Sequence, residues 1–584
     1  MRSFVADFET TTKEDDCRVW AWAVCEVGNR ENVIIGNTLD SFMEWCRSHK
    51  DNVKVFFHNL KFDGQWLIWW ALKNDFEYVE DPKDRKTHSF TTMISDMGMY
   101  YSIELVYYRH KKNLKNITFQ DSLKLIPMSV EGIAKALHLP IQKGEIDYKA
   151  HDDLPEGSPI SQEEEEYIKH DVQIVAYALE YFLSQGMDKM TVAACALAEY
   201  KRTLTKFAFK DFYPTPSPEH HNDIKQSYKG GFSYLNPKFK GKIVKDICVL
   251  DINSMYPAIM ASRYLPFDVP IFYKGKYEED RIYPLYVQMF RCKFKLKKGK
   301  IPSIQLKHNI HFNGTEYLTS SNGEEIVLCL TSVDMKLFYD QYDVSCEEWI
   351  SGWKFKATKG LYKNYITKWS NNKIQAKKDE NWGLYTISKL YLNSLYGKMG
   401  ADIQSVSKIP YLDENDVVHY KDGDPKPKKG IYIAMASFIT SYGRDQIIRA
   451  AQTITDAYNA GESDIQFIYS DTDSLHIKSP RYEMPKGLDI DDTILGYWKY
   501  EGRAIRGKYI RAKCYIEELT EDVYNFDDPE FKLKVTVAGM PKSCHSQVTF
   551  NNFKVGATYS GKLQHKIVRG GAILKECDFT IIDD

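Results

Sequence analysis

The sequence predicts an α+β protein built from several domains. Its 584 residues are too many for a single hydrophobic core, so we expect about three to five domains or subdomains. Apolar and β-branched runs at 3–12 and 465–477 are typical of strands, whereas the apolar spacing at 172–183 and 389–397 is typical of helices. The chain therefore combines both kinds of element along its whole length.

Composition indicates a folded globular protein, with 40 Tyr and 29 Phe. The longest candidate membrane segment, Trp66–Leu72, is an apolar run far shorter than the roughly 20 residues that span a bilayer. We therefore expect no membrane span, and no signal peptide because the chain leads directly into a strand and acidic residues. The 11 cysteines lack a CxxC pair, which argues for reduced thiols inside a cell and against a zinc site.

The net charge of −2 conceals an asymmetry between two parts of the chain. Residues 1–190 carry 22 Lys and Arg against 32 Asp and Glu, a balance of −10, whereas residues 191–584 carry 56 against 48, a balance of +8. Such an asymmetry can indicate a nucleic-acid protein. The lysines between 293 and 300 are candidate DNA contacts, and a solvated basic face is the alternative interpretation.

The most informative segment is Tyr469-Ser-Asp471-Thr-Asp473-Ser474. Apolar residues precede and follow it, so we predict that its two aspartates lie at the tight turn of a β-hairpin. Two carboxylates one residue apart repel each other, and a cation such as Mg²⁺ relieves that repulsion. A solvated hairpin tip is the alternative, and matching acidic segments elsewhere in the chain favour the metal site.

A second set of acidic residues begins near the N-terminus. Strand alternation puts Asp7 and Glu9 on one face of the first predicted strand. Asp63 follows another apolar strand, and Tyr167 and Asp171 share a helix face where they open the helix predicted at 172–183. Four carboxylates that converge on two metal ions can activate a water for phosphodiester hydrolysis, with the tyrosine orienting that water.

These segments, in this order and with these neighbours, resemble the 3′–5′ exonuclease of the DnaQ-like class, on a ribonuclease-H-like fold, as found in proofreading polymerases. The resemblance implies that Lys143 assists cleavage, because a cation beside a transferring phosphate is chemically favourable. It also implies a group of residues that grip the single-stranded primer end: Thr10, His58, Asn59, Phe62, Ser122 and Leu123.

A third acidic position, Asp251, follows a buried apolar strand. We predict that Pro257 closes the turn and starts the next helix, and that backbone N–H groups at 252–256 cradle a triphosphate. Asp251 and Asp473, brought together from two strands of one sheet, would hold catalytic ions with Asp471 close by. In-line attack of a primer 3′-hydroxyl on an α-phosphate then needs little beyond positioning and charge neutralisation.

The helix predicted around 389–397 carries a polar face made of Lys389, Asn393 and Tyr396, at i, i+4 and i+7. The lysine can neutralise incoming phosphates, and Tyr396 can pack on the nascent base pair. Tyr256 is bulky enough to exclude a 2′-hydroxyl, which predicts selection of deoxynucleotides. The predicted nucleotide-binding set is completed by Ser254 and Lys373.

The three segments around Asp251, Asn393 and Asp473 match motifs A, B and C of family B DNA polymerases, which also place the exonuclease first. The linker between exonuclease and palm in that family is matched by Tyr228, Gly230, Gly231 and Phe232; its glycines permit close approach to DNA. Lys513-Cys514-Tyr515 stands where the family has Lys-Thr-Tyr. Contact of Lys513 and Tyr515 with the primer terminus is therefore implied, whereas the middle hydroxyl is missing.

Two insertions, at 263–360 and 401–430, resemble those of protein-primed polymerases of phi-29-like phages, and this resemblance runs nearly end to end. It implies an α+β multidomain fold with a ribonuclease-H-like 3′–5′ exonuclease domain plus a right-hand polymerase domain of palm, fingers and thumb. The implied boundaries are 1–191 for the exonuclease, 192–262 and 431–545 for the palm, 263–360 and 401–430 for the insertions, 361–400 for the fingers and 546–584 for the thumb.

The same resemblance implies synthesis that starts from a hydroxyl of a terminal protein and then proceeds processively with strand displacement. One insertion would contact the terminal protein and DNA, and the other would close a ring around the duplex. The implied cofactors are two Mg²⁺ ions per site, replaceable by Mn²⁺. The implied partners are template-primer DNA, deoxynucleoside triphosphates and the terminal protein, for a monomeric enzyme in the cytoplasm of an infected bacterial host.

Three alternatives stay open on the sequence. A DNA-primed family B polymerase of a linear plasmid or mobile element would carry the same motifs. A nuclease could retain a degenerate polymerase half for binding DNA, although Asp251, Lys389, Asp471 and Asp473 are intact. A scaffold that binds nucleic acid without catalysis would leave seven well-placed carboxylates unexplained.

Overall fold

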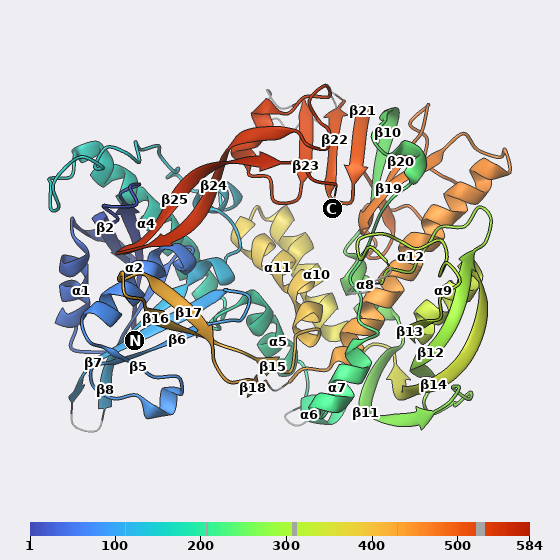
Figure 1. The fold of residues 1–584 in the computed structure, drawn as a ribbon, viewed down its shortest axis with the longest axis horizontal. Coiled ribbons are helices and arrows are strands. Elements are labelled where there is room, and N and C mark those ends of the chain that lie inside the picture. Colours follow the sequence, from blue (N-terminus) through green and yellow to red (C-terminus); the bar gives the residue numbers. More distant parts are fainter. Residues whose placement is uncertain (111–112, 206–207, 307–311, 429, 521–531, 584) are drawn as a thin grey trace.

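Figure 1 shows the fold of the computed structural model, which describes residues 1–110, 113–205, 208–306, 312–428, 430–520 and 532–583. Residues 307–311 of the first predicted insertion and residue 429 of the second lie outside the described residues. The N-terminal part (blue) lies at one end of the long axis, and a sheet formed by β11 to β14 (green) lies at the other end. The α+β prediction is confirmed.

The N-terminal part is organised around a mixed eight-stranded sheet, in the order β3-β2-β1-β4-β8-β7-β6-β5. Strand β1 pairs antiparallel with β2 and parallel with β4, so the predicted first strand lies inside the sheet. The strands are Arg2–Thr10 (β1), Val19–Glu26 (β2), Asn29–Gly36 (β3), Val53–Phe57 (β4), Glu77–Tyr78 (β5), Ser89–Ile94 (β6), Tyr100–His110 (β7) and Asn113–Asp121 (β8).

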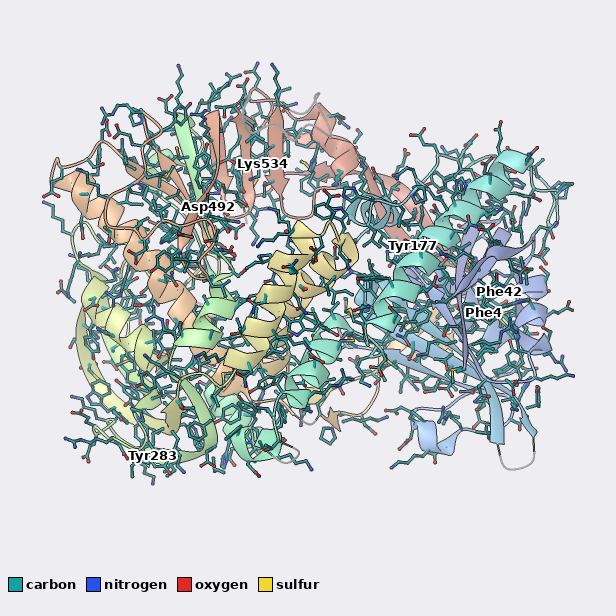
Figure 2. The ribbon with its side chains drawn as sticks, turned by 180° about the vertical axis from the view of Figure 1, so that it is seen from behind. Phe4, Phe42, Tyr177, Tyr283, Asp492 and Lys534 are labelled. Atoms are coloured by element: carbon teal, nitrogen blue, oxygen red, sulfur yellow. The ribbon has the colours of Figure 1, made fainter. Side chains whose placement is uncertain are left out.

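Helices cover this N-terminal sheet, and apolar side chains fill the space between them. Phe4 of β1 and Phe42 of the first helix belong to one buried core (Figure 2). Burial of such aromatic rings is the main favourable contribution to folding. The helices are Leu39–Ser48 (α1), Leu60–Lys73 (α2), Val130–Ala136 (α3) and Gln162–Ser184 (α4).

Helix α4 begins at Gln162, well before the predicted start at 172. Its N-cap Ser161 accepts the backbone N–H of Glu164, and the Glu164 carboxylate accepts the backbone N–H of Ser161 in return. This capping box and the acidic first turn stabilise the helix start. The prediction was wrong because only the apolar spacing was considered, so Tyr167 and Asp171 lie inside the helix instead of at its opening.

A seven-stranded central sheet has the order β23-β22-β21-β10-β20-β19-β9. The hairpin predicted at 465–477 is confirmed, because β19 and β20 pair antiparallel around Asp473. The strands are Phe232–Leu235 (β9), Ile243–Ile252 (β10), Gln466–Thr472 (β19), Ser474–Lys478 (β20), Trp498–Arg511 (β21), Cys514–Leu519 (β22) and Leu533–Val537 (β23).

Residues 263–360 contain a four-stranded sheet in the order β11-β14-β12-β13. Its strands are Leu265–Lys274 (β11), Leu285–Leu296 (β12), Ile326–Thr331 (β13) and Tyr342–Thr358 (β14). The long helix α12 (Ile433–Asn459) contacts both this sheet and the central sheet. The other helices of this part are Val192–Arg202 (α5), Ala208–Phe212 (α6), Pro218–Lys225 (α7), Met255–Ser262 (α8), Ser332–Gln341 (α9), Lys363–Lys378 (α10) and Trp382–Met399 (α11).

Two arms extend toward the N-terminal part (Figure 1). The first holds the hairpin β16–β17, and the second is the long hairpin β24–β25, drawn in red. Gly570 at the turn of the second arm has φ +93°, and a Cβ there would lie 2.4 Å from the carbonyl oxygen of Cys17. The arm strands are Gln404–Ser405 (β15), Lys408–Leu412 (β16), Val418–Asp422 (β17), Lys426–Pro427 (β18), Thr558–Val568 (β24) and Gly571–Thr580 (β25).

Asp416, at the tip of the first arm, joins the two arms to the N-terminal part. Its carboxylate lies 3.1 Å from the Lys73 ammonium of α2 and 3.6 Å from the guanidinium of Arg569 on the second arm. The indole N–H of Trp69 donates to its carbonyl oxygen. Both arms therefore reach the N-terminal part at one place. Among the described helices, none combines the length and apolar character needed to cross a bilayer.

Candidate active sites

The acidic turn at 471–473 is built by three neighbouring strands of the central sheet. Ser474 of β20 pairs with Asp251 of β10 on one side and with Asp471 of β19 on the other. Thr472 has φ +62°, a left-handed conformation that is unusual for a β-branched residue. The N–H of Asp473 donates to the carbonyl oxygen of Asp471 at 2.7 Å, which closes the turn. The predicted convergence of Asp251, Asp471 and Asp473 is therefore present in the backbone.

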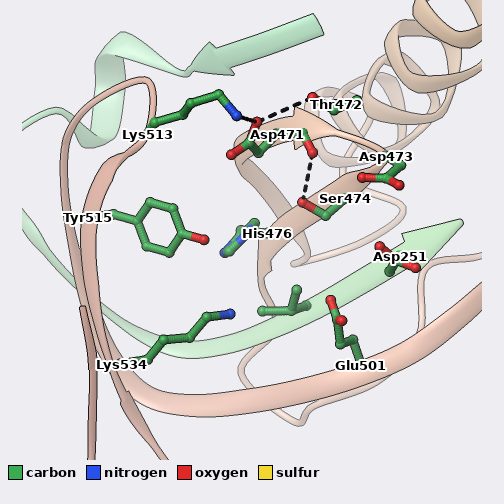
Figure 3. Close-up of a pocket in the computed structure, with 11 residues that line it drawn as sticks. Asp251, Asp471, Thr472, Asp473, Ser474, His476, Glu501, Lys513, Tyr515 and Lys534 are labelled. Atoms are coloured by element: carbon green, nitrogen blue, oxygen red, sulfur yellow. Dashed lines mark hydrogen bonds and ion pairs between the residues drawn. The ribbon is translucent and has the colours of Figure 1, made fainter. Parts of the chain in front are cut away.

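These three aspartates line one cavity of about 370 Å³, together with Lys513 and Tyr515. Figure 3 shows Asp251, Asp473 and Glu501 on one side of it and Lys513, Tyr515 and Lys534 on the other. Lys513 donates to Asp471 Oδ1 at 2.8 Å, and Ser233 donates to the same oxygen at 2.9 Å. The predicted primer-terminus residues therefore lie directly beside the predicted metal ligands.

Burial and crowding raise the pKa values of carboxylates in this cavity. Burial, reinforced by the nearby Asp251 carboxylate, raises the pKa of Asp473 to about 6. Burial also raises the pKa of Asp251, while Lys499, 3.1 Å from Asp251 Oδ1, opposes that shift. Burial and mutual repulsion make the ionised carboxylates of this cavity unfavourable, so the cavity favours binding of a cation that neutralises them.

Sequence reasoning missed Lys499 and Glu501, which alternate on β21. Lys499 pairs in register with Asp251, and Glu501 lines the same cavity. Their alternation along a strand was the available signal. It could not be used without knowledge that β21 pairs with β10, which lies far away in the sequence.

Sequence reasoning also missed a buried hydrogen-bonded pair at the base of the cavity. His476 Nδ1 lies 2.6 Å from Glu517 Oε1, and the hydroxyl of Tyr509 donates to the same oxygen at 2.6 Å. The ring of Tyr515 stacks on that of Tyr509, with centroids 5.4 Å apart. The pair therefore supports the side chain predicted to contact the primer terminus.

The predicted nucleotide-binding residues surround the start of α8 and the outer face of α11. The rings of Tyr256 and Tyr396 are in contact, with centroids 4.3 Å apart. Lys389 and Asn393 are exposed on α11, as the i, i+4, i+7 spacing predicts. Lys373 of α10 has a pKa lowered by burial and by the nearby Lys389 and Lys499. Several cations thus lie close to Asp251.

Two details of the predicted phosphate cradle are wrong. Helix α8 begins at Met255, so Pro257 lies within its first turn and does not start it. The N–H groups of Ile252 and Asn253 donate to the carbonyl oxygens of Asp473 and Tyr497 and cannot also hold a phosphate. The N-cap Ser254 makes no capping side-chain bond within the described chain, which leaves its hydroxyl for a ligand.

The predicted linker lies against the acidic turn. Thr472 pairs with Phe232 of β9, and the Phe232 ring is buried in the core. A Cβ added to Gly231 would lie 2.8 Å from the Thr472 side chain and 3.1 Å from the Tyr256 hydroxyl. Glycine is therefore required there for close packing. The hydroxyl of Tyr228 approaches Gly400, at the end of α11.

Three of the four predicted N-terminal carboxylates line a second cavity, of about 770 Å³, whereas the fourth, Asp63, is buried and does not line it. It contains Asp7, Glu9, Tyr167 and Asp171 from β1 and α4, together with Lys143. The Lys143 ammonium forms an ion pair with Asp171 Oδ2 and lies 5.0 Å from the centroid of the Tyr167 ring. Residues from strand, helix and loop thus meet as predicted, and Lys143 is part of the site.

Burial dominates the titration of this cluster. It raises the pKa of Asp7, with help from Asp171, to about 7, and it raises the pKa values of Glu9 and Asp63 well above their ordinary range. Asp63 Oδ1 and Asp171 Oδ1 are buried and have no hydrogen-bond partner among the described residues. Unpartnered buried carboxylate oxygens are the donor type that a hard divalent cation takes, so these residues fit a metal ion.

No group of three or more Asp, Glu, His or Cys side chains within the described ranges is already arranged as a full metal-ligand set. Lysine ammonium groups instead form ion pairs with one carboxylate of the N-terminal cluster and with two of the three central aspartates. Lys143 bonds Asp171, Lys499 bonds Asp251, and Lys513 bonds Asp471. Ion binding would therefore displace lysine contacts, which makes the affinity depend on these three side chains.

Only some of the residues predicted to grip the primer end line the second cavity. Thr10 and Phe62 line the second cavity, and Asn59 is exposed in a left-handed conformation at the start of α2. The Ser122 side chain is instead fully buried, where its hydroxyl contacts His58 Nδ1 at 2.9 Å. Leu123 donates its N–H to Asp121 Oδ1. Ser122 and His58 therefore support the wall of the site from inside the protein.

The second arm covers this cavity, which the sequence did not predict. Leu563, Ile573 and Leu574 of β24 and β25 line it opposite the acidic residues. Lys575 of the arm forms an ion pair with Glu14 at 3.2 Å. The cavity therefore has an acidic floor and a roof that combines apolar side chains with the Lys575 ammonium group.

Comparison with known proteins agrees with this geometry. Residues 45–157 and 155–493 match the family described as DNA polymerase type B, organellar and viral. The chain is 40% identical over 593 residues to the DNA polymerase of Bacillus phage phi29, and the match covers 99% of each protein. It is 33% identical over 599 residues to the DNA polymerase of Streptococcus phage Cp-1, and that match covers 99% of this chain and 98% of the phage protein. A structure of phi29 DNA polymerase complexed with primer-template DNA and incoming nucleotides matches with a TM-score of 0.90 and 39% identity, covering 99% of this chain and all of that one.

The comparisons also confirm the fold class, an exonuclease joined to a right-hand polymerase. A second structure, phi29 DNA polymerase with primer-template DNA after translocation, gives a TM-score of 0.91 at 39% identity. Identity and coverage of this extent exceed what a shared fold alone would require. The chain is a DNA polymerase and belongs to the organellar and viral type B family.

Proposed function

We propose that this polymerase is a protein-primed, processive and strand-displacing phage enzyme with a proofreading 3′–5′ exonuclease. The observation that carries the proposal is the presence of two separate acidic cavities in one chain, one at Asp251, Asp471 and Asp473 and one at Asp7, Glu9 and Asp171. Each cavity combines buried or half-buried carboxylates with a lysine, the arrangement that phosphoryl transfer needs. We assign synthesis to the first and degradation to the second.

In the synthetic site, Asp251, Asp471 and Asp473 would hold two Mg²⁺ ions, which Mn²⁺ can replace. Enzymes of this family use divalent metals, and bound ions neutralise charge on the transferring phosphate. Lys389 and Lys373 would bind the triphosphate, and Ser254 would donate its hydroxyl to it. The Tyr256 and Tyr396 rings would exclude a 2′-hydroxyl and pack on the new base pair, with Asn393 beside them.

In the degradative site, Asp7, Glu9, Asp63 and Asp171 would hold the metal ions. Tyr167 would orient the attacking water, and Lys143 would stabilise charge on the phosphate as the bond breaks. Thr10, Asn59 and Phe62 would contact the unpaired primer end, with His58, Ser122 and Leu123 shaping the wall. The linker 228–232 would pass the primer end between the two sites.

The relatives support the choice of partners, and the arms support a ring around the duplex. One phi29 polymerase structure is a complex with primer-template DNA and incoming nucleotides, and we infer the same partners here, with a terminal protein as the first primer. The contacts of Asp416 with Lys73 and Arg569 support a ring of both arms around the duplex. We infer a monomer that acts in the cytoplasm of an infected bacterium, with the domain boundaries given above.

The test is incubation of the pure protein with its candidate terminal protein, Mg²⁺ and labelled dATP. We expect a covalent protein–nucleotide adduct and, on an ordinary primer-template, extension by all four deoxynucleotides. Extension without an adduct would favour the DNA-primed alternative. Degradation without extension would leave the nuclease alone, and the absence of both activities would leave the nucleic-acid scaffold.

A further inference from the structure

Arg444 is a buried arginine of α12 that joins three parts of the structure. Its side chain is 5% exposed, and all five guanidinium N–H groups have acceptors. Nε and Nη2 donate to the two carboxylate oxygens of Asp334 at 3.2 and 2.7 Å, and Nη2 also donates to Ser441 Oγ at 2.9 Å. Nη1 donates to the carbonyl oxygens of Lys229 and Gly230, both at 2.7 Å.

Asp334 anchors the arginine from the four-stranded sheet side. It lies in the first turn of α9, whose N-cap Thr331 donates its hydroxyl to Asp334 Oδ2 at 3.0 Å. The Ser441 hydroxyl lies 2.7 Å from the same oxygen. A buried charge pair with this many hydrogen bonds has one geometry, because any displacement leaves polar atoms unpaired.

The carbonyl bonds go to the linker, on the side away from the acidic turn. Gly230 is exposed, and water is the alternative partner for main-chain groups at a protein surface. On its other side the linker packs against Thr472 and Tyr256 at Gly231. Residues 229–231 are therefore held between the arginine and the catalytic turn.

The linker also forms one wall of a cavity of about 640 Å³. Tyr228, Gly230 and Arg444 line it together with Gln305 and Tyr317 of the first insertion. A strand of DNA that enters this cavity would meet the linker where the arginine fixes it. Movement of the linker would then change both the cavity and the turn at Thr472.

We infer that Arg444 is a positioning residue that fixes the linker 228–231 against the turn 471–473 and thereby sets the balance between extension and degradation. The inference rests on the proposed function, because it needs both activities in one chain. It predicts that the balance depends on the hydrogen bonds from Arg444 to the carbonyl oxygens of the linker, and not only on the ion pair with Asp334. The lysine variant separates the two, since one ammonium cannot reproduce the planar fork that serves a carboxylate and two carbonyls.

The experiment uses the full chain and a labelled primer-template at increasing deoxynucleotide concentration. The measured quantity is the concentration at which extension balances degradation. We expect Arg444→Lys to raise it by about 10-fold, while degradation of single-stranded DNA stays within about twofold of the unmodified chain. Arg444→Ala should raise it at least as much if the variant folds, which thermal unfolding reports.

Arg449→Ala is the matched control. Arg449 lies on the same helix and bridges α9 through Asp340 at 2.8 Å, and its ion-pair partners, Asp340 and Asp445, both lie outside the linker. The balance in this variant should stay within about twofold. Asp334→Asn keeps the carbonyl bonds possible and should shift the balance less than Arg444→Lys does.

The inference is overturned if extension and degradation by the Arg444→Lys variant balance at the same nucleotide concentration as in the unmodified chain. It is also overturned if both activities fall by one common factor, or if the lysine variant does not fold, because the arginine would then only support the fold. Failure of the proposed function would look different, since the unmodified chain itself would lack one of the two activities.

Discussion

The main-chain carbonyl oxygen of Asp473 accepts a hydrogen bond of 2.8 Å from the N–H of Ile252. This bond fastens the acidic turn between β19 and β20 to the end of β10, the strand that delivers Asp251. The Asp473 side chain takes no part in it. Replacement of the carboxylate therefore leaves the turn held by the main chain, and activity can be tested without loss of the fold.

Asp473→Asn should reduce primer extension by on the order of 1000-fold, because a carboxylate that would hold the ions becomes a neutral amide. Degradation of single-stranded DNA should stay within about twofold, since the second cavity is lined by other residues. A gel assay with labelled primer measures both. Asp464→Asn, at an exposed aspartate paired with Arg481, is the control. Extension at the unmodified rate by the Asp473 variant would contradict the assignment.

Asp7→Asn should have the opposite effect. Degradation should fall by on the order of 100-fold or more, and extension of a matched primer should persist, because the polymerising cavity is intact. Incorporation errors should rise, which sequencing of the products measures. A proportional fall of both activities in this variant would mean that the chain has one site and not two.

Divalent ions should stabilise the folded chain in a pH-dependent way. The pKa values of Asp7 and Asp473 are raised to about 7 and about 6 by burial and neighbouring carboxylates. Carboxylates with raised values keep their protons in the folded state, so their contribution to stability is complete below about pH 4 and is lost as pH rises through 6 to 7. Without ions, these groups should lower the Tm between pH 5 and 8.

Added Mn²⁺ should raise the Tm more at pH 8 than at pH 5, because it binds the ionised form. The Asp7→Asn, Asp473→Asn double variant should lose most of this difference. Scanning calorimetry at the two pH values, with and without the ion, measures it. An equal shift at both pH values would show that the ion binds elsewhere.

Tyr256→Val should relax sugar selection. The Tyr256 ring, packed on Tyr396, would no longer fill the space of a 2′-hydroxyl, so we expect ribonucleotide incorporation relative to deoxynucleotide to rise by about 100-fold. Tyr256→Phe keeps the ring and should keep the discrimination. Single-nucleotide kcat/KM values measure both. Unchanged selection in the valine variant would remove Tyr256 from this task.

Deletion of 401–430 should impair synthesis through long duplex more than the filling of a short gap. The deletion removes Asp416 and its contacts with Lys73 and Arg569, which would open the ring of the two arms. Product lengths on a long displaced template, compared with a short gap, measure this. Equal losses on both substrates would count against the ring.

The local parts of the site were predictable because each rests on one continuous pattern. Asp251 and Asp473 follow apolar strands, and Lys389 and Asn393 share a helical spacing. Residues that are close in the sequence therefore determine the local structure around each of these side chains. Lys499 and Glu501 were missed because only the pairing of β21 with β10 brings them beside Asp251 and the cavity. Such register between distant strands leaves no local signal.

The start of α4 shows a different limit. Its capping box, Ser161 with Glu164, was readable in the sequence, but the acidic run obscured the helix because apolar spacing begins only later. The ion pair of Arg444 with Asp334 could not be predicted either. In a sequence, two charged residues on separate helices look like surface residues, and only the packing of the helices shows that they are buried.

The central claim is that divalent ions bind at two separate acidic clusters in this chain. Anomalous scattering from a crystal soaked in Mn²⁺ tests it most directly. We expect peaks beside Asp251 and Asp473 and, separately, beside Asp7, Glu9 and Asp171. A map with no peak at either cluster, in a crystal that holds Mn²⁺ elsewhere, would contradict the claim.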